Sequence, residues 1–271
     1  MSTIIIQRLD GTKYDLDALG FRVKQFNIPL SNYSYAYQQI GKYGSTRTDS
    51  YQQYLVIPLI LTITAEDIND YNLQLFELRR IMRSDEDFYV INSVMPYMRW
   101  KCRAEAVTPT QNGNFWRSAD VTINLDCADG YAESVATTLT PISFSSGAWG
   151  FGQNIPDNDI SFEFSSNDFV FYNLGLIPLT ADERPAKIIF NGDAPNGFTI
   201  TNKTTGQSFK LNRGVSRSDT VIINGIMPLV NGEQAYKDSN HGYLDFAIGE
   251  NQIHIDGASN FDIKFDTRFY Y

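Results

Sequence analysis

The stretch that decides the fold is residues 31–61, SNYSYAYQQIGKYGSTRTDSYQQYLVIPLIL. Tyr33, Tyr35 and Tyr37 alternate with small or polar residues, which is the period of two expected of a β-strand. A polar turn containing glycine follows, and then an apolar run that is interrupted by Pro58. The stretch predicts strands that carry more apolar surface than this half of the chain can bury by itself.

The apolar run YLVIPLILTI (54–63) predicts a strand that is covered on both faces, because it is apolar at successive positions. Pro58 favours an edge or a bulge, since proline cannot donate to a ladder. A helix covers only one face, so either the domain's own barrel or a neighbouring subunit covers the other, and both remain open. Tyrosine suits a partly wet interface. The candidate subunit-interface residues are Tyr33, Tyr35, Tyr37, Tyr54, Val56 and Leu59.

The composition indicates a folded, strand-rich protein. The 271 residues suffice for one large or two ordinary domains. Apolar residues make up 42% and charged residues 20%, as in globular proteins, and the aromatic content of 14% favours strands. No segment has the roughly 20 continuous apolar residues of a membrane span, and the start of the chain lacks the features of a signal peptide. We therefore expect a protein that folds in a cytoplasm.

Charge and cysteine content exclude two further classes. The formal net charge of −9 argues against a general nucleic-acid binder, and the basic residues are scattered. Two cysteines are too few for a disulfide-rich secreted domain. If QNGN (111–114) is a tight hairpin turn, Cys102 lies opposite residue 123, about four residues from Cys127. We therefore expect no disulfide between them.

One segment predicts a helix, TAEDINDYNLQLFELRRIMRSDED (64–87). Thr64 can serve as the N-cap, with acidic residues in the first turn and arginines in the last. The apolar residues fall three or four apart and form one stripe, which indicates a packing face rather than a partner-helix or cofactor site. The stripe consists of Ile68, Tyr71, Leu75, Leu78 and Met82.

The composition changes at residues 130–159, which are rich in Ser, Thr, Gly, Pro and Asn and predict a connection outside any core. The expected domains are 1–138 and 139–271. Trp149 in this connection is the tryptophan expected to be exposed, whereas Trp100 and Trp116 are expected in the core. Beyond it, many short strand-like segments with turns between them predict an antiparallel sandwich or barrel.

The sequence offers no positive sign of chemistry. It has two histidines, His241 in a loop and His254 on the outer side of a strand, and no metalloprotease, nucleophile-elbow or P-loop motif. We assign no catalytic residue, no metal ligand and no cofactor. A pair of acids of the glycosidase type remains open, because such acids meet only in the folded chain.

The order of these segments resembles the distal tail protein (Dit) family of siphophages, the phages with long non-contractile tails. In the first half the resemblance rests on GKYGSTRTDSYQQYLVIPLILTI, the helix AEDINDYNLQLFELRRIMR, MRWKCRAEA, the hairpin and VTINLDCADGYAES. In the second half it rests on residues 169–212, DTVIING, IGENQIHI and FDIKFDTRFYY. One departure is Asp129-Gly130-Tyr131, where the family often has Asp-Pro-aromatic.

The resemblance implies a mainly β protein with an α+β first domain that closes into a homohexameric ring and a galectin-like β-sandwich as second domain. It implies a structural hub at the virion tail tip, made in the host bacterial cytoplasm, that joins the tail tube protein to the tail-associated protein and can support receptor-binding proteins. DNA passes through such a ring without specific binding, and no catalysis is implied. The second candidate function is a carbohydrate-binding adhesion module that contacts the host cell wall. The third is a cell-wall hydrolase that uses a pair of acidic residues.

Overall fold

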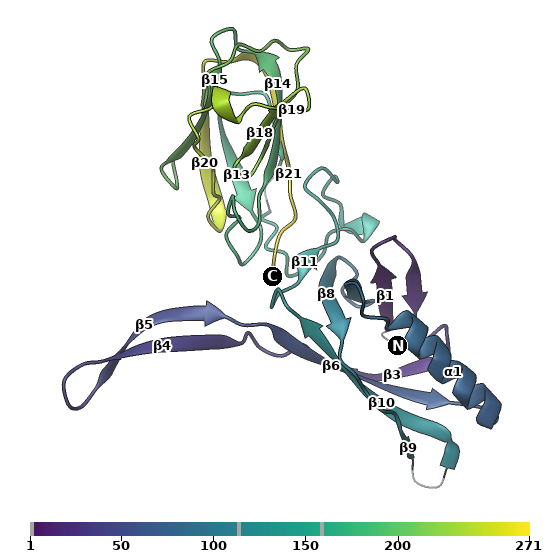
Figure 1. The fold of residues 1–271 in the computed structure, drawn as a ribbon. Coiled ribbons are helices and arrows are strands. Elements are labelled where there is room, and N and C mark those ends of the chain that lie inside the picture. The colour runs from purple at the N-terminus through teal and green to yellow at the C-terminus, as the bar shows by residue number, and fades with distance from the viewer. Residues whose placement is uncertain (1–2, 113–114, 158–159) are drawn as a thin grey trace. The chain divides into compact units, whose positions relative to one another are not determined.

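The structure is a computed structural model that describes residues 3–112, 115–157 and 160–271 (Figure 1). The chain divides into two compact units, Met1–Glu133 (unit 1) and Ser134–Tyr271 (unit 2). Both are built mainly of antiparallel strands, and the α-helix of the described residues lies in unit 1. The mainly β fold predicted from the sequence, with an α+β first part, is confirmed.

Unit 1 contains a long antiparallel sheet and a separate two-stranded ribbon. The sheet order is β2-β1-β7-β8-β10-β6-β3, with β9 also paired to β10, and the ribbon is β4-β5. The elements are β1 (Ile4–Arg8), β2 (Lys13–Asp15), β3 (Phe21–Phe26), β4 (Tyr33–Gln39), β5 (Ser45–Gln52), β6 (Leu55–Thr64), α1 (Ile68–Ile81), β7 (Phe88–Asn92), β8 (Met98–Ala104), β9 (Thr110–Asn112) and β10 (Phe115–Cys127). The short β11 (Glu133–Ser134) spans the boundary between the units.

The apolar run of residues 54–63 contains most of strand β6, which lies between β10 and the end strand β3. Strand β6 pairs with β10 along its whole length, from Leu55 opposite Cys127 to Thr64 opposite Ser118. Its odd-numbered side chains are buried and its even-numbered side chains, up to Thr62, are half-buried. Within the single chain one face is closed and the other is partly open, so unit 1 does not by itself cover both faces of β6 completely. Cover of the open face by a neighbouring subunit remains a prediction.

Pro58 lies where β6 has a neighbour on one side. It pairs with Asn124 of β10, whereas β3 on the other side ends at Phe26, which pairs with Leu59. Proline lacks the N–H that a second ladder would need. The prediction that Pro58 occupies an edge-like position is confirmed for that side of the strand.

Helix α1 begins one turn later than predicted. Its N-cap is Asp67 rather than Thr64, since the Asp67 carboxylate accepts hydrogen bonds from the N–H groups of Asn69 (2.7 Å) and Asp70 (2.8 Å). Aspartate at this position satisfies amides that have no partner inside the helix. The packing stripe is confirmed at Tyr71, Leu78 and Met82, which are buried, while Ile68 in the first turn is exposed.

Gly130 explains the departure from the Asp-Pro-aromatic pattern. Its φ is +74°, and a Cβ at this position would lie 2.6 Å from the carbonyl oxygen of Gln53. Proline is fixed near φ −65° and cannot adopt this conformation. The Gly130 carbonyl oxygen accepts a hydrogen bond from Nε2 of Gln52 (2.7 Å), so the turn is tied to the end of β5.

Unit 2 is a two-sheet antiparallel sandwich. One sheet has the order β12-β21-β14-β17-β18-β19 and the other β13-β20-β15-β16. Buried side chains from both sheets, among them Phe190 of β14 and Phe209 of β16, form one core. The strands are β12 (Glu163–Phe164), β13 (Asp168–Asn173), β14 (Lys187–Asp193), β15 (Phe198–Asn202), β16 (Gln207–Leu211), β17 (Val221–Asn224), β18 (Met227–Val230), β19 (Glu233–Gln234), β20 (Gly249–Asp256) and β21 (Ser259–Asp266).

Two segments of unit 2 differ from the prediction. Residues 243–248, one of the short strand-like segments of the second half, form a single bridge, between Phe246 and Leu179. Residues 134–153, expected as a connection, lie against the C-terminal segment: the N–H of Ser134 donates to the Phe269 carbonyl (2.8 Å) and that of Thr138 to the Thr267 carbonyl (3.0 Å). This part of the expected connection therefore belongs to the sandwich.

Trp149 corrects the prediction of an exposed tryptophan. Its side chain is 1% exposed, its Nε1 donates to the Thr140 carbonyl oxygen (3.3 Å), and its ring centroid lies 6.3 Å from that of Phe269. Trp100 is buried as predicted. The side chain of Trp116 and the turn at residues 113–114 lie outside the described residues, although β9 and β10 pair as the hairpin prediction requires.

Candidate assembly surfaces

The ribbon of β4 and β5, residues 33–52, is the most exposed part of unit 1, and we call it the arm. Its strands pair with each other from Tyr33 opposite Gln52 to Gln39 opposite Ser45, and within the described residues they join no other sheet. Figure 1 shows the arm extending away from the strands of the long sheet. A two-stranded ribbon is only marginally stable in water without a further surface to pack on.

The predicted tyrosines lie on this arm. Tyr33, Tyr35 and Tyr37 are 42%, 46% and 59% exposed. The rings of Tyr35 and Tyr37 are neighbours, with centroids 6.5 Å apart, and the guanidinium of Arg47 lies over the Tyr35 ring at 4.3 Å from its centroid. Stacked aromatic and guanidinium groups of this kind are enriched in protein interfaces.

The arm differs in charge from the rest of the chain. It contains Lys42, Arg47 and Asp49, which give 2 − 1 = +1, so the remaining residues carry −9 − 1 = −10. The Asp49 carboxylate accepts hydrogen bonds from the Tyr51 hydroxyl and from the Ser50 N–H, and both bonds lower the pKa of Asp49, the first more than the second. The bond to Asp49 also raises the pKa of Tyr51. The arm is therefore a weakly basic, tyrosine-rich surface on an acidic protein.

The residues at the base of the arm divide between surface and core. Tyr54 is exposed and Val56 is half-buried, which agrees with an open face. Leu59 has no exposed surface and is buried within unit 1. This placement corrects the expectation for Leu59, because its odd position on β6 turns it to the closed face of the sheet.

The open face of β6 and β10 combines an apolar row with polar neighbours. The apolar row is Val56, Pro58 and Ile60. Beyond it the carboxylate of Asp120 accepts hydrogen bonds from Nζ of Lys24 (2.6 Å) and Oγ1 of Thr62 (2.8 Å). A half-buried apolar row with charged and hydroxyl groups beside it suits a protein–protein interface, in which the apolar row is shielded from water and the polar groups form the rim.

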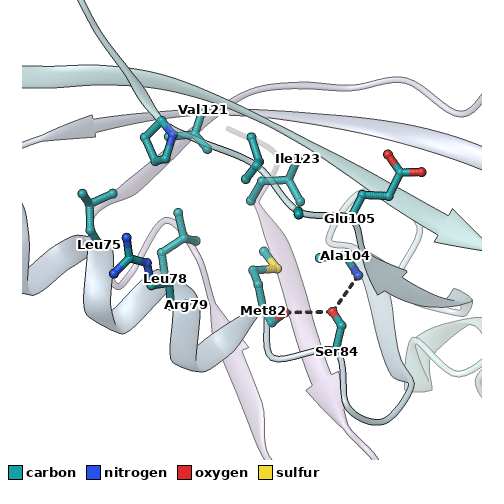
Figure 2. A pocket seen from close by; sticks show the side chains of 12 residues that line it. Leu75, Leu78, Arg79, Met82, Ser84, Ala104, Glu105, Val121 and Ile123 are labelled. Atoms are coloured by element: carbon teal, nitrogen blue, oxygen red, sulfur yellow. Dashed lines mark hydrogen bonds between the residues drawn. The ribbon is translucent and has the colours of Figure 1, made fainter.

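A second open surface lies between α1 and the strands that it covers, and Figure 2 shows its lining side chains. It is a groove of about 370 Å³ with an apolar lining and with Arg79 and Glu105 as charged members. Ser84 fixes one end, since its Oγ donates to the Met82 carbonyl (2.9 Å) and accepts from the Ala104 N–H (2.8 Å). The apolar lining includes Leu75, Leu78, Met82, Val107, Pro109, Val121 and Ile123.

The histidine expected to face outward forms a surface ion cluster. His254 Nδ1 lies 2.8 Å from the carboxylate of Asp168, which also accepts a hydrogen bond from Lys203 Nζ (2.9 Å). The bond from Lys203, and then that from His254, lowers the pKa of Asp168. These groups link β13 and β20 to the turn after β15. We therefore interpret the cluster as a structural contact rather than a functional site.

The described residues also bear on metal binding and on membrane insertion. Among residues 3–112, 115–157 and 160–271, no group of three or more His, Cys, Asp and Glu side chains could hold a metal ion. In the same residues, no helix is long and apolar enough to cross a membrane.

The comparisons first define the class of unit 1. Residues 9–127 match the family model of the phage tail protein RIFT-related domain. This segment of unit 1 is therefore similar to a phage tail domain. No curated protein sequence matches the chain.

The whole chain has the fold of a distal tail protein. It is similar to the solved structure of the Dit protein (gp 19.1) of phage SPP1, described as a paradigm of the hub adsorption apparatus in phages that infect Gram-positive hosts. The match covers 99% of each chain, with a TM-score of 0.71 and 14% sequence identity. A chain of the phage p2 baseplate in its activated conformation with Sr matches over 98% of each chain, with a TM-score of 0.50 and 10% identity. The fold expected from the resemblance to siphophage distal tail proteins is thereby confirmed.

The sequence identified the tyrosine face of the arm but missed other exposed apolar residues near it. Leu30, Ile40 and Tyr43 are 91%, 61% and 98% exposed. For Ile40 and Tyr43 the available signal was their position beside the turn glycines, since turn residues are rarely buried. The groove could not be found from the sequence, because it joins side chains from α1, β10 and the segment between β8 and β9.

Proposed function

We propose that this protein is the structural hub of a phage tail tip, and that unit 1 closes into a homohexameric ring. The observation that carries the proposal is the arm of a phage tail domain, a tyrosine-rich ribbon that joins no other sheet within the described residues. A ribbon of two strands gains stability when a neighbouring subunit covers it. Head-to-tail contacts of this type generate closed rings when the rotation between copies closes.

The candidate contact residues are Tyr33, Tyr35, Tyr37, Tyr54 and Val56. Buried tyrosine and arginine side chains supply much of the binding energy of protein interfaces. The opposite signs of the arm (+1) and of the remaining residues (−10) favour a contact between the arm of one copy and the body of the next. Leu59 is not part of this proposal.

The ring would continue the tail tube and carry DNA without holding it. Six copies have a formal charge of 6 × −9 = −54. A surface with this charge repels the phosphate backbone, whereas specific or general DNA binders are basic. In this assembly one face of the ring meets the tail tube protein and the other the tail-associated protein.

Unit 2 is proposed as the outer part of the hub, a galectin-like sandwich that supports receptor-binding proteins. The two compact units support a division of roles between domains near the proposed bounds of 1–138 and 139–271. The proposed location is the virion tail tip, with synthesis in the host bacterial cytoplasm. The carbohydrate-binding alternative loses its principal aromatic residue, since Trp149 is buried.

The experiment that tests this proposal is native mass spectrometry of the full chain, alone and mixed with the tail tube protein of the same phage. The proposal predicts six copies per assembly in at least one of the two conditions. A matched variant, Tyr35→Ser/Tyr37→Ser, should remain folded and fail to assemble. A wild-type chain that is monomeric in both conditions would contradict the proposal.

A further inference from the structure

The two cysteines of unit 1 occupy opposite positions on adjacent strands. Strands β8 and β10 pair Ala104 with Leu125 and Arg103 with Asp126, and the same register continued by one position places Cys102 opposite Cys127. Both residues continue in regular strand, since Cys102 also pairs with Phe88 of β7 and Cys127 with Leu55 of β6. The sequence-based placement of Cys102 opposite residue 123 is therefore wrong by four residues.

Of the two kinds of residue pair in an antiparallel ladder, the cysteines occupy the kind with the shorter Cα–Cα distance. The Glu105 N–H donates to the Asn124 carbonyl oxygen (2.8 Å), which marks a hydrogen-bonded pair three positions before the cysteines. Hydrogen-bonded and non-hydrogen-bonded pairs alternate along an antiparallel ladder. The cysteines thus occupy a non-hydrogen-bonded pair, where Cα atoms lie about 4.5 Å apart, inside the range that a disulfide can span.

The two thiols interact with each other. They are free, buried, and joined by a hydrogen bond between their side chains. This bond raises the pKa of Cys102, and burial adds to the effect. It lowers the pKa of Cys127, which also receives the Gly130 N–H. The two thiols are therefore close enough for each to shift the pKa of the other.

A charged pocket lies beside Cys102. A pocket of about 320 Å³ is lined by Cys102 together with the charged side chains around it. These are Asp87, Lys101, Arg103, Asp126 and Asp129. Lys101 and Arg103 alternate with Cys102 along β8, so their side chains lie on the opposite face of the strand from its thiol. Hydrogen peroxide is small and uncharged and reaches the thiols through local opening of the sheet, whereas the burial of both thiols holds off a bulky reagent.

We propose that Cys102 and Cys127 form a modification site, a cross-strand dithiol that a small peroxide converts into a disulfide. Peroxide oxidises one thiol to a sulfenic acid and leaves as water; the second thiol attacks that sulfur, the S–S bond forms and a second water is released. The two cysteines lose two electrons and two protons in total, and the O–O bond of the peroxide is reduced.

The bond would lie where the sheet of unit 1 is held by few ladder pairs. Strand β10 has register pairs with β6 from residue 118 to 127, but with β8 at two described positions. A covalent link across β8 and β10 therefore joins the two halves of the sheet and restricts the unfolded chain. The inference concerns the single chain and does not depend on the proposed ring.

The test is oxidation of the reduced full chain with hydrogen peroxide, followed by intact-mass measurement and peptide mapping. We expect the native chain to lose two hydrogens, with one peptide pair linked through Cys102 and Cys127. We also expect the unfolding midpoint of unit 1 to rise by several degrees and to return after treatment with dithiothreitol. Because the link is mapped in the wild-type chain, the result does not depend on a cysteine variant that folds.

Cys127→Ala serves as the matched variant, and its Cys102 should gain oxygen without any loss of hydrogens. Three results in the native wild-type chain would overturn the inference. They are addition of oxygen atoms without a disulfide, a disulfide between two copies, and thiols that stay unmodified at peroxide concentrations that oxidise the urea-unfolded chain.

Discussion

Arg47 lies over the ring of Tyr35, with its guanidinium carbon 4.3 Å from the ring centroid, although its partner in the strand register is Tyr37. The register shifts between Ala36 and Tyr37, and this irregularity allows Arg47 to lie over the neighbouring tyrosine. An exposed cation–π pair holds two long side chains in place before a partner arrives, which lowers the entropy lost on binding. The tyrosine face of the arm is therefore partly preorganised.

The first prediction concerns the arm. Tyr35→Ser/Tyr37→Ser should weaken self-association at least tenfold, because exposed aromatic anchors typically contribute more than about 1 kcal/mol each to an interface. The unfolding midpoint should change little, since both side chains are about half exposed. Sedimentation velocity over a range of protein concentrations measures the first effect and circular dichroism the second.

Tyr243→Ser is the control for this experiment, because Tyr243 is a comparably exposed tyrosine of unit 2 (46%). It should leave self-association unchanged. Equal effects of the arm and control variants would show that the loss is not specific to the arm.

The second prediction separates the two faces of β6. Leu59→Ala should destabilise unit 1 by about 2–5 kcal/mol, because it leaves a cavity where the side chain is fully buried. Val56→Ala, on the half-buried face, should cost about 1 kcal/mol or less but should weaken assembly. Urea unfolding measures both free energies. Similar losses of stability in the two variants would disprove the assignment of faces.

The third prediction concerns the segment first expected to be a connection. Trp149→Ala should destabilise unit 2 by about 3–5 kcal/mol, since the ring is buried against Phe269. Leu176→Ala, at an exposed position of the same unit, should cost less than about 0.5 kcal/mol. Thermal unfolding followed by calorimetry compares the two. A Trp149→Ala protein as stable as the wild type would contradict the burial of this side chain.

The fourth prediction concerns pH. Hydrogen bonds from Asn231 and Ser216 lower the pKa of Asp219 from 3.8 to about 2. Because the folded pKa is depressed, this contribution to stability is complete above about pH 4 and is lost as pH falls from 3.8 through about 2. Carboxyl NMR titration should give the low pKa. In Asp219→Asn this part of the pH dependence should disappear, and an unchanged acid profile would refute the assignment.

The strands could largely be predicted from the sequence where side chains alternate regularly. The sequence predicted no strand at residues 21–26, where β3 lies, because a register shift between Val23 and Gln25 breaks the alternation of FRVKQF. The register of the cysteines was missed for a related reason. The register of the β9–β10 ladder shifts between Phe115 and Ala119. Strand partners obtained by counting residues outward from the turn are therefore wrong beyond this shift. Such irregularities depend on tertiary packing and leave little trace in local composition.

The surface residues were predictable only in part. Alternation identified Tyr33, Tyr35 and Tyr37 as one face of a strand, and the structure places them on an exposed ribbon. Composition could not place Leu59 or Trp149, because their burial depends on which face a strand turns inward and on contacts with the distant C-terminal residues. The polar residues around Trp149 suggested a connection, yet hydrogen bonds to the C-terminal segment hold them in the sandwich.

Electron microscopy of the purified assembly tests the proposed ring most directly. The account predicts a closed ring of six copies in which unit 1 forms the wall and the arm, residues 33–52, contacts the adjacent copy. An assembly held together by unit 2 alone, or a ring in which the arm touches no neighbour, would contradict it.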